Sequence, residues 1–143
     1  MKMKETKSFQ SKLDSLALIR QYVTSAARES GLDDKLTYKL CLAVDEVASN
    51  IIMYGYQESG LTGLIDIHID VDGKSLMITM EDDAAAYDPR QHELPSEEEI
   101  NRPLDERPVG GLGLFLVFNS VDDYKYEYAG GRNRNIFIMN LQN

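Results

Sequence analysis

The feature that most limits the fold is a pair of alternating segments in the middle of the chain. Between residues 65 and 71 every second residue is Ile or Val, and the residues between them are Asp or His. Leu76, Ile78 and Met80 repeat the same period, and Asp72 and Gly73 between the two segments are typical of a hairpin turn. These segments predict two antiparallel strands with one polar face and one apolar face that must be covered.

Two amphipathic helices before the hairpin can supply that cover. The first is expected to start at a cap formed by Asp14 or Ser15 and to end before Gly31, and the second runs from Asp33 and Asp34 to Gly55. Their apolar residues recur at helical spacing: Leu16, Ile19, Tyr22, Val23 and Ala26 in the first, and Leu36, Leu40, Val44, Val47 and Ile51 in the second.

The remaining segments complete an α+β layout. Residues 4–10 are predicted as an edge strand, residues 111–121 as a helix, and residues 124–128 and 136–141 as two strands joined at Gly130 and Gly131. Strands and helices do not alternate regularly, which argues against a parallel Rossmann-type sheet, and the chain has no P-loop sequence. We expect one domain, residues 1–143, built as a two-layer α/β sandwich: a mostly antiparallel mixed sheet covered on one face by helices.

Composition excludes several classes of function. A net charge of −9 argues against nucleic-acid binding, because phosphates require a basic surface. No apolar run is long enough to span a bilayer and the N-terminus lacks the apolar core of a signal peptide, so we expect a cytoplasmic protein without membrane contact. The lone Cys41 is predicted to be a buried hydrophobe, and neither His68 nor His92 lies in a cluster of metal ligands.

Two short segments carry the chemistry. Glu46 and Asn50 lie four residues apart on the second helix, and therefore on the same face. Residues 110–114, GGLGL, form a glycine-rich turn before a helix, where backbone N–H groups and the helix dipole favour a phosphate. An acid and an amide on one helix and a phosphate cradle on another indicate a magnesium–nucleotide site.

Residues 84–110, between the hairpin and the glycines, are predicted to form a lid. They contain all four prolines and show no periodicity, which in a compact domain is typical of a functional loop. Basic residues are expected to contact phosphate in this acidic protein, and Arg107 is the lid arginine nearest the glycines.

Three motifs together resemble a known family. Residues 43–51, AVDEVASNI, followed by IMYGY, resemble the N-box of the GHKL ATP-binding superfamily, and more narrowly that of bacterial anti-sigma-factor serine/threonine kinases. Residues 82–89, DDAAAYDP, match the family pattern D-x-G-x-x-F-D-P, and residues 111–114, GLGL, match its G-x-G-L box. The matches occur in the family's order from the second helix to the C-terminus, and they imply a histidine-kinase-like ATPase fold.

The resemblance implies a role for each matching residue. Asn50 would be the Mg²⁺ ligand, Glu46 the general base that deprotonates a serine of a partner protein, and Asp82 the acceptor for the adenine amino group of ATP. The phosphates would be bound by the backbone of the glycine turn, which comprises Gly110, Gly111, Leu112, Gly113 and Leu114.

The resemblance also implies partners. These are a STAS-like anti-anti-sigma factor that receives the phosphate, a sigma factor as a further client, and a second copy of the chain. The exposed edge strand at residues 4–10 would permit such a homodimer by pairing.

One residue departs from the family pattern. Ala84 stands where the pattern has glycine, beside the expected adenine site. Alanine fits if its φ is negative, and otherwise the pocket is narrowed and ATP binding is weakened or lost. The alternative function is therefore a catalytically inactive module of the same fold that sequesters a partner and binds nucleotide weakly or not at all.

Overall fold

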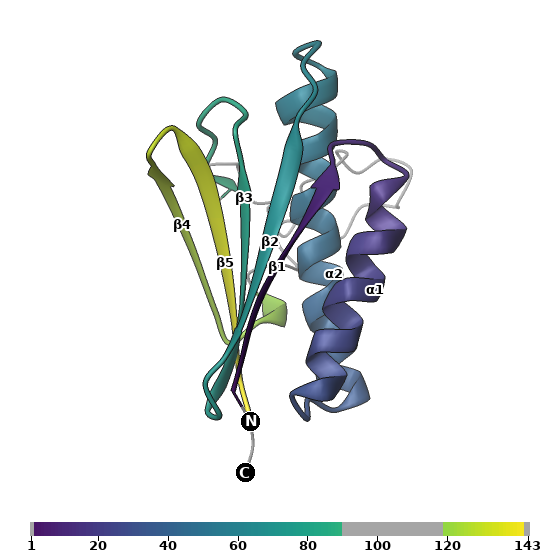
Figure 1. Cartoon of the computed structure of the whole chain (residues 1–143), viewed down its shortest axis with the longest axis vertical. Helices are drawn as coiled ribbons and strands as arrows, with labels where there is room; N and C mark the ends of the chain where they lie inside the picture. The colour runs from purple at the N-terminus through teal and green to yellow at the C-terminus, as the bar shows by residue number, and fades with distance from the viewer. Residues whose placement is uncertain (1, 90–118, 142–143) are drawn as a thin grey trace, which may run out of the picture.

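The computed structural model describes residues 2–89 and 119–141, and within them a five-stranded sheet carries helices on one face (Figure 1). The strands are β1 Met3–Gln10, β2 Leu64–Val71, β3 Ser75–Asp82, β4 Asp123–Ala129 and β5 Arg132–Asn140. Their order across the sheet is β1-β2-β3-β5-β4, and all four pairings are antiparallel. The predicted α+β sandwich with helices on one face is confirmed.

The hairpin predicted from alternation is β2 and β3. Its turn is held by Asp72, whose Oδ1 accepts hydrogen bonds from the backbone N–H groups of Lys74 and Ser75 at 2.9 and 2.8 Å. Gly73 between them has φ of +94°, a conformation that glycine adopts at little cost.

The second hairpin consists of β4 and β5, and its turn determines the residue at which β5 begins. Gly130 and Gly131 form the turn with φ of +63° and +76°, as a two-residue hairpin turn requires. Arg132 therefore pairs directly with Ala129, and β5 begins four residues before the predicted start at residue 136. The longer β5 continues its pairing with β3 until Asn133 lies opposite Asp82.

Helix α1 (Ser15–Glu29) begins and ends near the predicted residues, and helix α2 (Asp34–Asn50) begins where it was predicted to begin. Asp33 caps α2, because its Oδ1 accepts a hydrogen bond from the N–H of Leu36 at 2.8 Å. Asp14 occupies the cap position of α1 without a side-chain hydrogen bond. Gly31 follows α1 with φ of +93°, which is the expected conformation just past a helix end.

The end of the second helix was predicted incorrectly. It does not stop at Gly55 but continues from α2 into a π-helix, η1 (Ile51–Gln57). Backbone hydrogen bonds spanning five residues continue beyond it, from Glu58 N–H to Met53 O at 2.9 Å and from Leu61 N–H to Tyr56 O at 2.8 Å. The wider turn lets Gly55 continue the helix, so this glycine does not end it.

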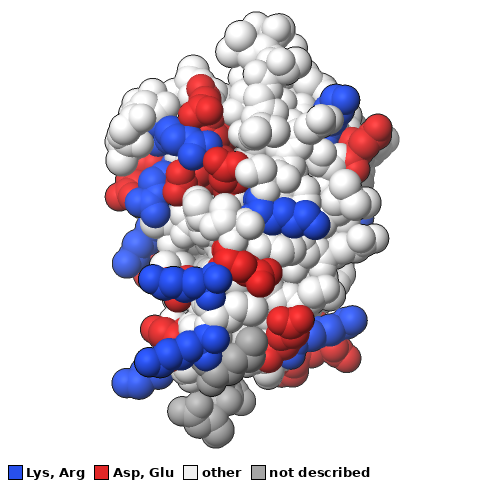
Figure 2. All heavy atoms as spheres, in the orientation of Figure 1, with Lys and Arg blue, Asp and Glu red and all other residues white. Residues whose placement is uncertain are grey.

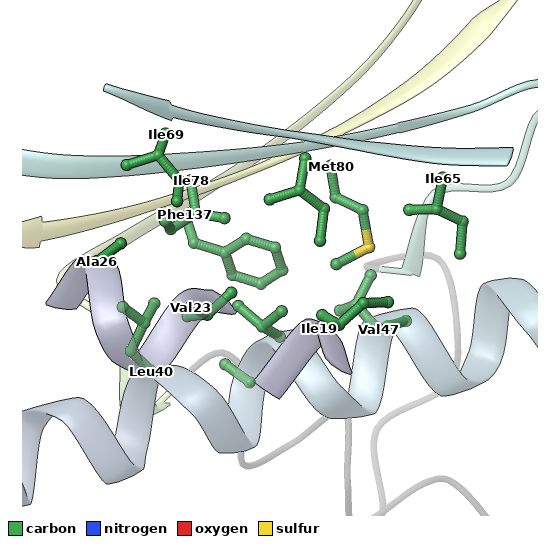
Figure 3. Packing of buried hydrophobic residues seen from close by; sticks show 14 of the residues in the cluster. Ile19, Val23, Ala26, Leu40, Val47, Ile65, Ile69, Ile78, Met80 and Phe137 are labelled. Atoms are coloured by element: carbon green, nitrogen blue, oxygen red, sulfur yellow. The ribbon is translucent and has the colours of Figure 1, made fainter. Parts of the chain in front are cut away.

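The core lies between the helices and one face of the sheet (Figure 3). Ile19 and Val23 of α1 and Leu40 and Val47 of α2 point toward the sheet, where Ile65, Ile69, Ile78, Met80 and Phe137 meet them. Burial of each such side chain stabilises the fold by roughly 1.5–3 kcal/mol. The predicted apolar face of the hairpin is therefore the covered face.

The opposite face of the sheet carries a network of charged residues centred on Arg132. Its guanidinium bonds Asp66 at 2.9 Å, Glu81 at 3.0 Å and Asp83 at 2.8 Å. Arg134 bonds Glu81 at 3.3 Å and also pairs with Glu127. Figure 2 shows basic and acidic side chains interspersed over the strand side of the molecule. His68 takes part in this polar face through Thr6 Oγ1, 2.7 Å from its Nδ1.

Candidate functional site: a cavity at the end of strand β3

Asp82, the last residue of β3, is buried with an exposed fraction of only 1%. Its Oδ1 accepts hydrogen bonds from the Ala84 N–H and from the side-chain amide of Asn133, each at 3.0 Å. Its Oδ2 is buried and has no hydrogen-bond partner among the residues that the structure describes. A buried acceptor without a partner costs on the order of 1–3 kcal/mol or more, so this oxygen is suited to a ligand that donates a hydrogen bond.

Burial also affects the charge of this carboxyl group. It raises the pKa of Asp82 above its ordinary value, although the hydrogen bonds from Asn133 and Ala84 act in the opposite direction.

Asn133 holds the polar side of the site together. Its Nδ2 donates to Asp82 Oδ1 and to the carbonyl oxygens of Ala84 and Ala85 at 3.0 and 3.1 Å. Its Oδ1 accepts from the Tyr87 N–H at 3.0 Å and from the Tyr126 hydroxyl. One buried side chain therefore orients the carboxylate and fixes the segment after β3.

A cavity of about 240 Å³ lies against this cluster. One wall comes from the end of α2 and from η1, where Val47, Asn50 and Gly55 line it. The other comes from Asp82, residues 84–87 and β5. Its residues are largely apolar around a few polar groups, as is usual for a small-molecule pocket.

Of the two functional residues predicted on α2, one lines the cavity and the other does not. Asn50 lines it, while Glu46 lies one helical turn earlier and is half-buried outside its lining. Burial, together with the neighbouring Asp45, raises the pKa of Glu46 above its ordinary value of 4.5. A carboxylate with a raised pKa is a better proton acceptor, as a general base must be.

Helix η1 connects to the site through Tyr56, which sequence reasoning did not single out. Its hydroxyl accepts a hydrogen bond from the Asp83 N–H at 2.9 Å and donates to the Leu64 carbonyl at 3.3 Å. Gly63 lies so close that a Cβ there would be 2.6 Å from the Tyr56 ring. Tyr56 thus links the π-helix to the strand ends next to Asp82.

The backbone of Ala84 does not have the positive φ that would favour glycine at this position. No non-glycine residue in the described ranges has a positive φ, so alanine is accommodated without strain at this position. Its methyl group is buried, lines the cavity and faces Gly55: a Cβ added to Gly55 would lie 3.0 Å from it.

The predicted phosphate-binding residues cannot be placed. Gly110, Gly111, Leu112, Gly113, Leu114 and Arg107 lie outside the described residues, as do residues 90–110 of the predicted lid. No group of three or more His, Cys, Asp or Glu side chains in the described ranges could hold a metal ion. The described part of the site is suited to a largely apolar group that carries a hydrogen-bond donor.

Comparison with known proteins agrees with this geometry. The histidine kinase-like ATPase domain family matches residues 9–140. A serine-protein kinase RsbW of Bacillus cereus (strain B4264) is 27% identical over 123 residues, which cover 84% of this chain and 74% of that protein. The same-named protein of Bacillus anthracis (strain CDC 684 / NRRL 3495) is 26% identical over 123 residues, with the same coverage.

No helix in the described part of the chain is long and apolar enough to cross a membrane. Since the family's sequence pattern extends from β1 to β5 and includes every element that builds the cavity, the chain belongs to the histidine kinase-like ATPase domain family.

Proposed function

We propose that this chain is an ATP-dependent serine/threonine kinase of the anti-sigma type that phosphorylates a STAS-like anti-anti-sigma factor. The observation that carries the proposal is the buried Asp82 Oδ2, which has no partner in the described ranges, at a cavity of about 240 Å³. An adenine amino group supplies the donor that this oxygen requires.

The remaining nucleotide contacts follow from the position of Asn50 and from the family pattern. Asn50, at the cavity wall, would be a ligand of Mg²⁺ through its carboxamide oxygen. Gly110, Gly111, Leu112, Gly113 and Leu114 would hold the phosphates, and Arg107 would contact the γ-phosphate. Bound Mg²⁺–ATP supplies the transferable phosphoryl group.

Glu46 is proposed as the general base. It lies one turn from Asn50 on the same helix face, and its raised pKa favours acceptance of a proton from a partner's serine hydroxyl. The partner would therefore approach along α2 toward the cavity. We also propose that the protein is one domain, acts in the cytoplasm, forms a homodimer and regulates transcription through the anti-anti-sigma factor or through a sigma factor itself.

The test is phosphate transfer to the STAS-like protein of the same operon, with wild type and Glu46→Gln compared. We expect transfer to fall by about 10²–10⁴-fold in Glu46→Gln, because the hydroxyl loses its base, while ATP affinity changes little. Glu29→Gln, an exposed position at the end of α1, is the matched control and should leave transfer unchanged. Unchanged transfer in Glu46→Gln would remove Glu46 as the base.

The second candidate is the partner-sequestering module without kinase activity. It is favoured by the methyl group of Ala84, which occupies space at the cavity. If wild type binds the partner tightly but neither binds ATP nor transfers phosphate, this second function is the correct one.

A further inference from the structure

Three features of the cavity limit the size of the group that can bind beside Asp82. The first is the contact between Ala84 and Gly55, both of which line the cavity. A Cβ on Gly55 would lie 3.0 Å from the Ala84 methyl, which is tighter than nine in ten real Cβ contacts. Gly55 does not have a positive φ, so its backbone does not require glycine. Glycine at this position avoids that tight contact with the Ala84 methyl.

The second feature is how firmly Ala84 is held. Its N–H donates to Asp82 Oδ1 and its carbonyl accepts from Asn133 Nδ2, both at 3.0 Å. With polar bonds on both sides and an exposed fraction of 4%, the residue has little freedom to move aside for a ligand. Its methyl group is thus a fixed part of the cavity wall.

The third feature is that Ala84 is bonded to the same Asp82 carboxylate that would bind the ligand. Ala84 bonds the Oδ1 atom of the carboxylate whose other oxygen, Oδ2, has no partner in the described ranges. Asp82 and Ala84 line the same cavity, so a ligand that donates to Oδ2 shares that cavity with the Ala84 methyl, and a substituent on its donor adds to the volume that the cavity must hold.

From these contacts we propose that Ala84, backed by Gly55, is a specificity-determining residue. It restricts the base subsite to purines with an unsubstituted exocyclic amine and excludes those enlarged at that amine. This inference rests on the proposed ATP site and adds a selection that the site's acceptor oxygen alone does not provide. A donor remains on N6-methyladenine, so hydrogen bonding alone would admit it, whereas the size of the subsite excludes it.

The test is calorimetric binding of ATP and N6-methyl-ATP in the presence of Mg²⁺. Wild type should bind ATP and should bind N6-methyl-ATP at least tenfold more weakly, since a misfit of one methyl group is worth roughly 10–200-fold. Ala84→Gly should reduce this discrimination by about tenfold or more, because the lost methyl adds space next to Asp82. Ala129→Gly adds the same backbone freedom at an exposed position outside the cavity lining and should keep the wild-type ratio.

A reciprocal pair of variants separates a size effect from a general loss of folding. Gly55→Ala alone should weaken ATP binding, because its Cβ pushes the Ala84 methyl out of place. The double variant Gly55→Ala, Ala84→Gly moves the methyl across the contact and should bind ATP better than Gly55→Ala does. Thermal unfolding of each variant identifies any that fails to fold.

The outcomes also distinguish this inference from the proposed function. An unchanged ratio in Ala84→Gly, with ATP binding intact, overturns the inference and leaves the ATP site standing. ATP binding by Ala84→Gly but not by wild type overturns both the inference and the kinase proposal, because the wild-type subsite then excludes adenine itself. If neither protein binds either nucleotide, both proposals are wrong.

Discussion

At the scale of single residues, the site depends on one carboxylate and the amide that orients it. Asp82 was predicted from its place in a motif at the end of a strand. Asn133 was not predicted as a site residue, because its contacts are with residues about 50 positions earlier in the chain. No local pattern contains such a contact, and only the early start of β5 brings the two side chains together.

Glu46 allows a prediction about stability as well as activity. Because folding raises its pKa, its ionisation destabilises the folded state, and this cost grows as pH rises through the folded-state pKa. Glu46→Gln should therefore be more stable than wild type at pH 7, and the difference should vanish below the ordinary pKa of 4.5. Urea unfolding at pH 7 and pH 4 measures it. A variant that is less stable than wild type at pH 7 would contradict the predicted sign.

The same pKa sets the direction of the pH dependence of transfer. A general base acts when deprotonated, so transfer should decline on acidification at a higher pH than an ordinary glutamate would give. A pH–rate profile of phosphate transfer measures this decline.

At the scale of elements, the alternating strands and the helices were predictable because their apolar periods are local properties. The π-helix η1 was not, since a turn widened by one residue leaves no distinct period in a segment of seven residues. Gly55 was interpreted as a helix end, but it lies inside η1, where a Cβ would lie 3.0 Å from the Ala84 methyl. The contact between Gly55 and Ala84 joins segments that are distant in the sequence, so no local sequence pattern predicts it.

The prediction at this scale concerns the attachment of η1 to the sheet. Tyr56→Phe removes the hydroxyl that satisfies both the Asp83 N–H and the Leu64 carbonyl, and it should destabilise the fold by about 1–3 kcal/mol. ATP binding should weaken with it, because Asp83 adjoins Asp82. Tyr54→Phe, on the same helix with an exposed side chain, is the control and should change stability by less than about 0.5 kcal/mol. Equal stabilities of the two variants in urea would contradict this role.

At the scale of the whole molecule, the sheet separates two environments. Its covered face is apolar and ends in the cavity, and its other face carries the network around Arg132. Residues of the two faces are adjacent in β5 where it pairs with the end of β3: Arg132 belongs to the charged face and Asn133 to the covered face. The proposed homodimer and the docking of a partner belong to this scale, and β1, at one edge of the described sheet, is where pairing with a second copy is proposed.

Arg132→Gln tests what the network contributes to the fold. It leaves Asp66, Glu81 and Asp83 without their shared cation, and we expect a loss of about 1–3 kcal/mol at pH 7. Burial raises the pKa of Asp66, but the bonds from Ser8 and Arg132 outweigh it and hold that pKa below its ordinary value. Stability from this source is present above the unfolded-state pKa and is lost as pH falls through the folded-state pKa.

The difference in the free energy of unfolding between Arg132→Gln and wild type should therefore become smaller in acid. Urea unfolding of both proteins at pH 7 and pH 3 measures it. Arg28→Gln breaks only an exposed pair with Asp34 at 3.8 Å, so it is the control and should change stability by less than about 0.5 kcal/mol. A difference that grows in acid would show that the network does not act through ionised carboxylates.

The most direct test of the central claim, that the cavity beside Asp82 binds the base of ATP, is calorimetric titration of Mg²⁺–ATP into wild type, Asp82→Asn and Asp83→Asn. Asp82→Asn keeps the side chain's shape but presents an amide where the ligand's donor requires an acceptor. We predict that it lowers ATP affinity at least 100-fold, while Asp83→Asn, an exposed neighbour bonded to Arg132, changes affinity by less than threefold. Equal ATP affinity in wild type and Asp82→Asn would contradict the account.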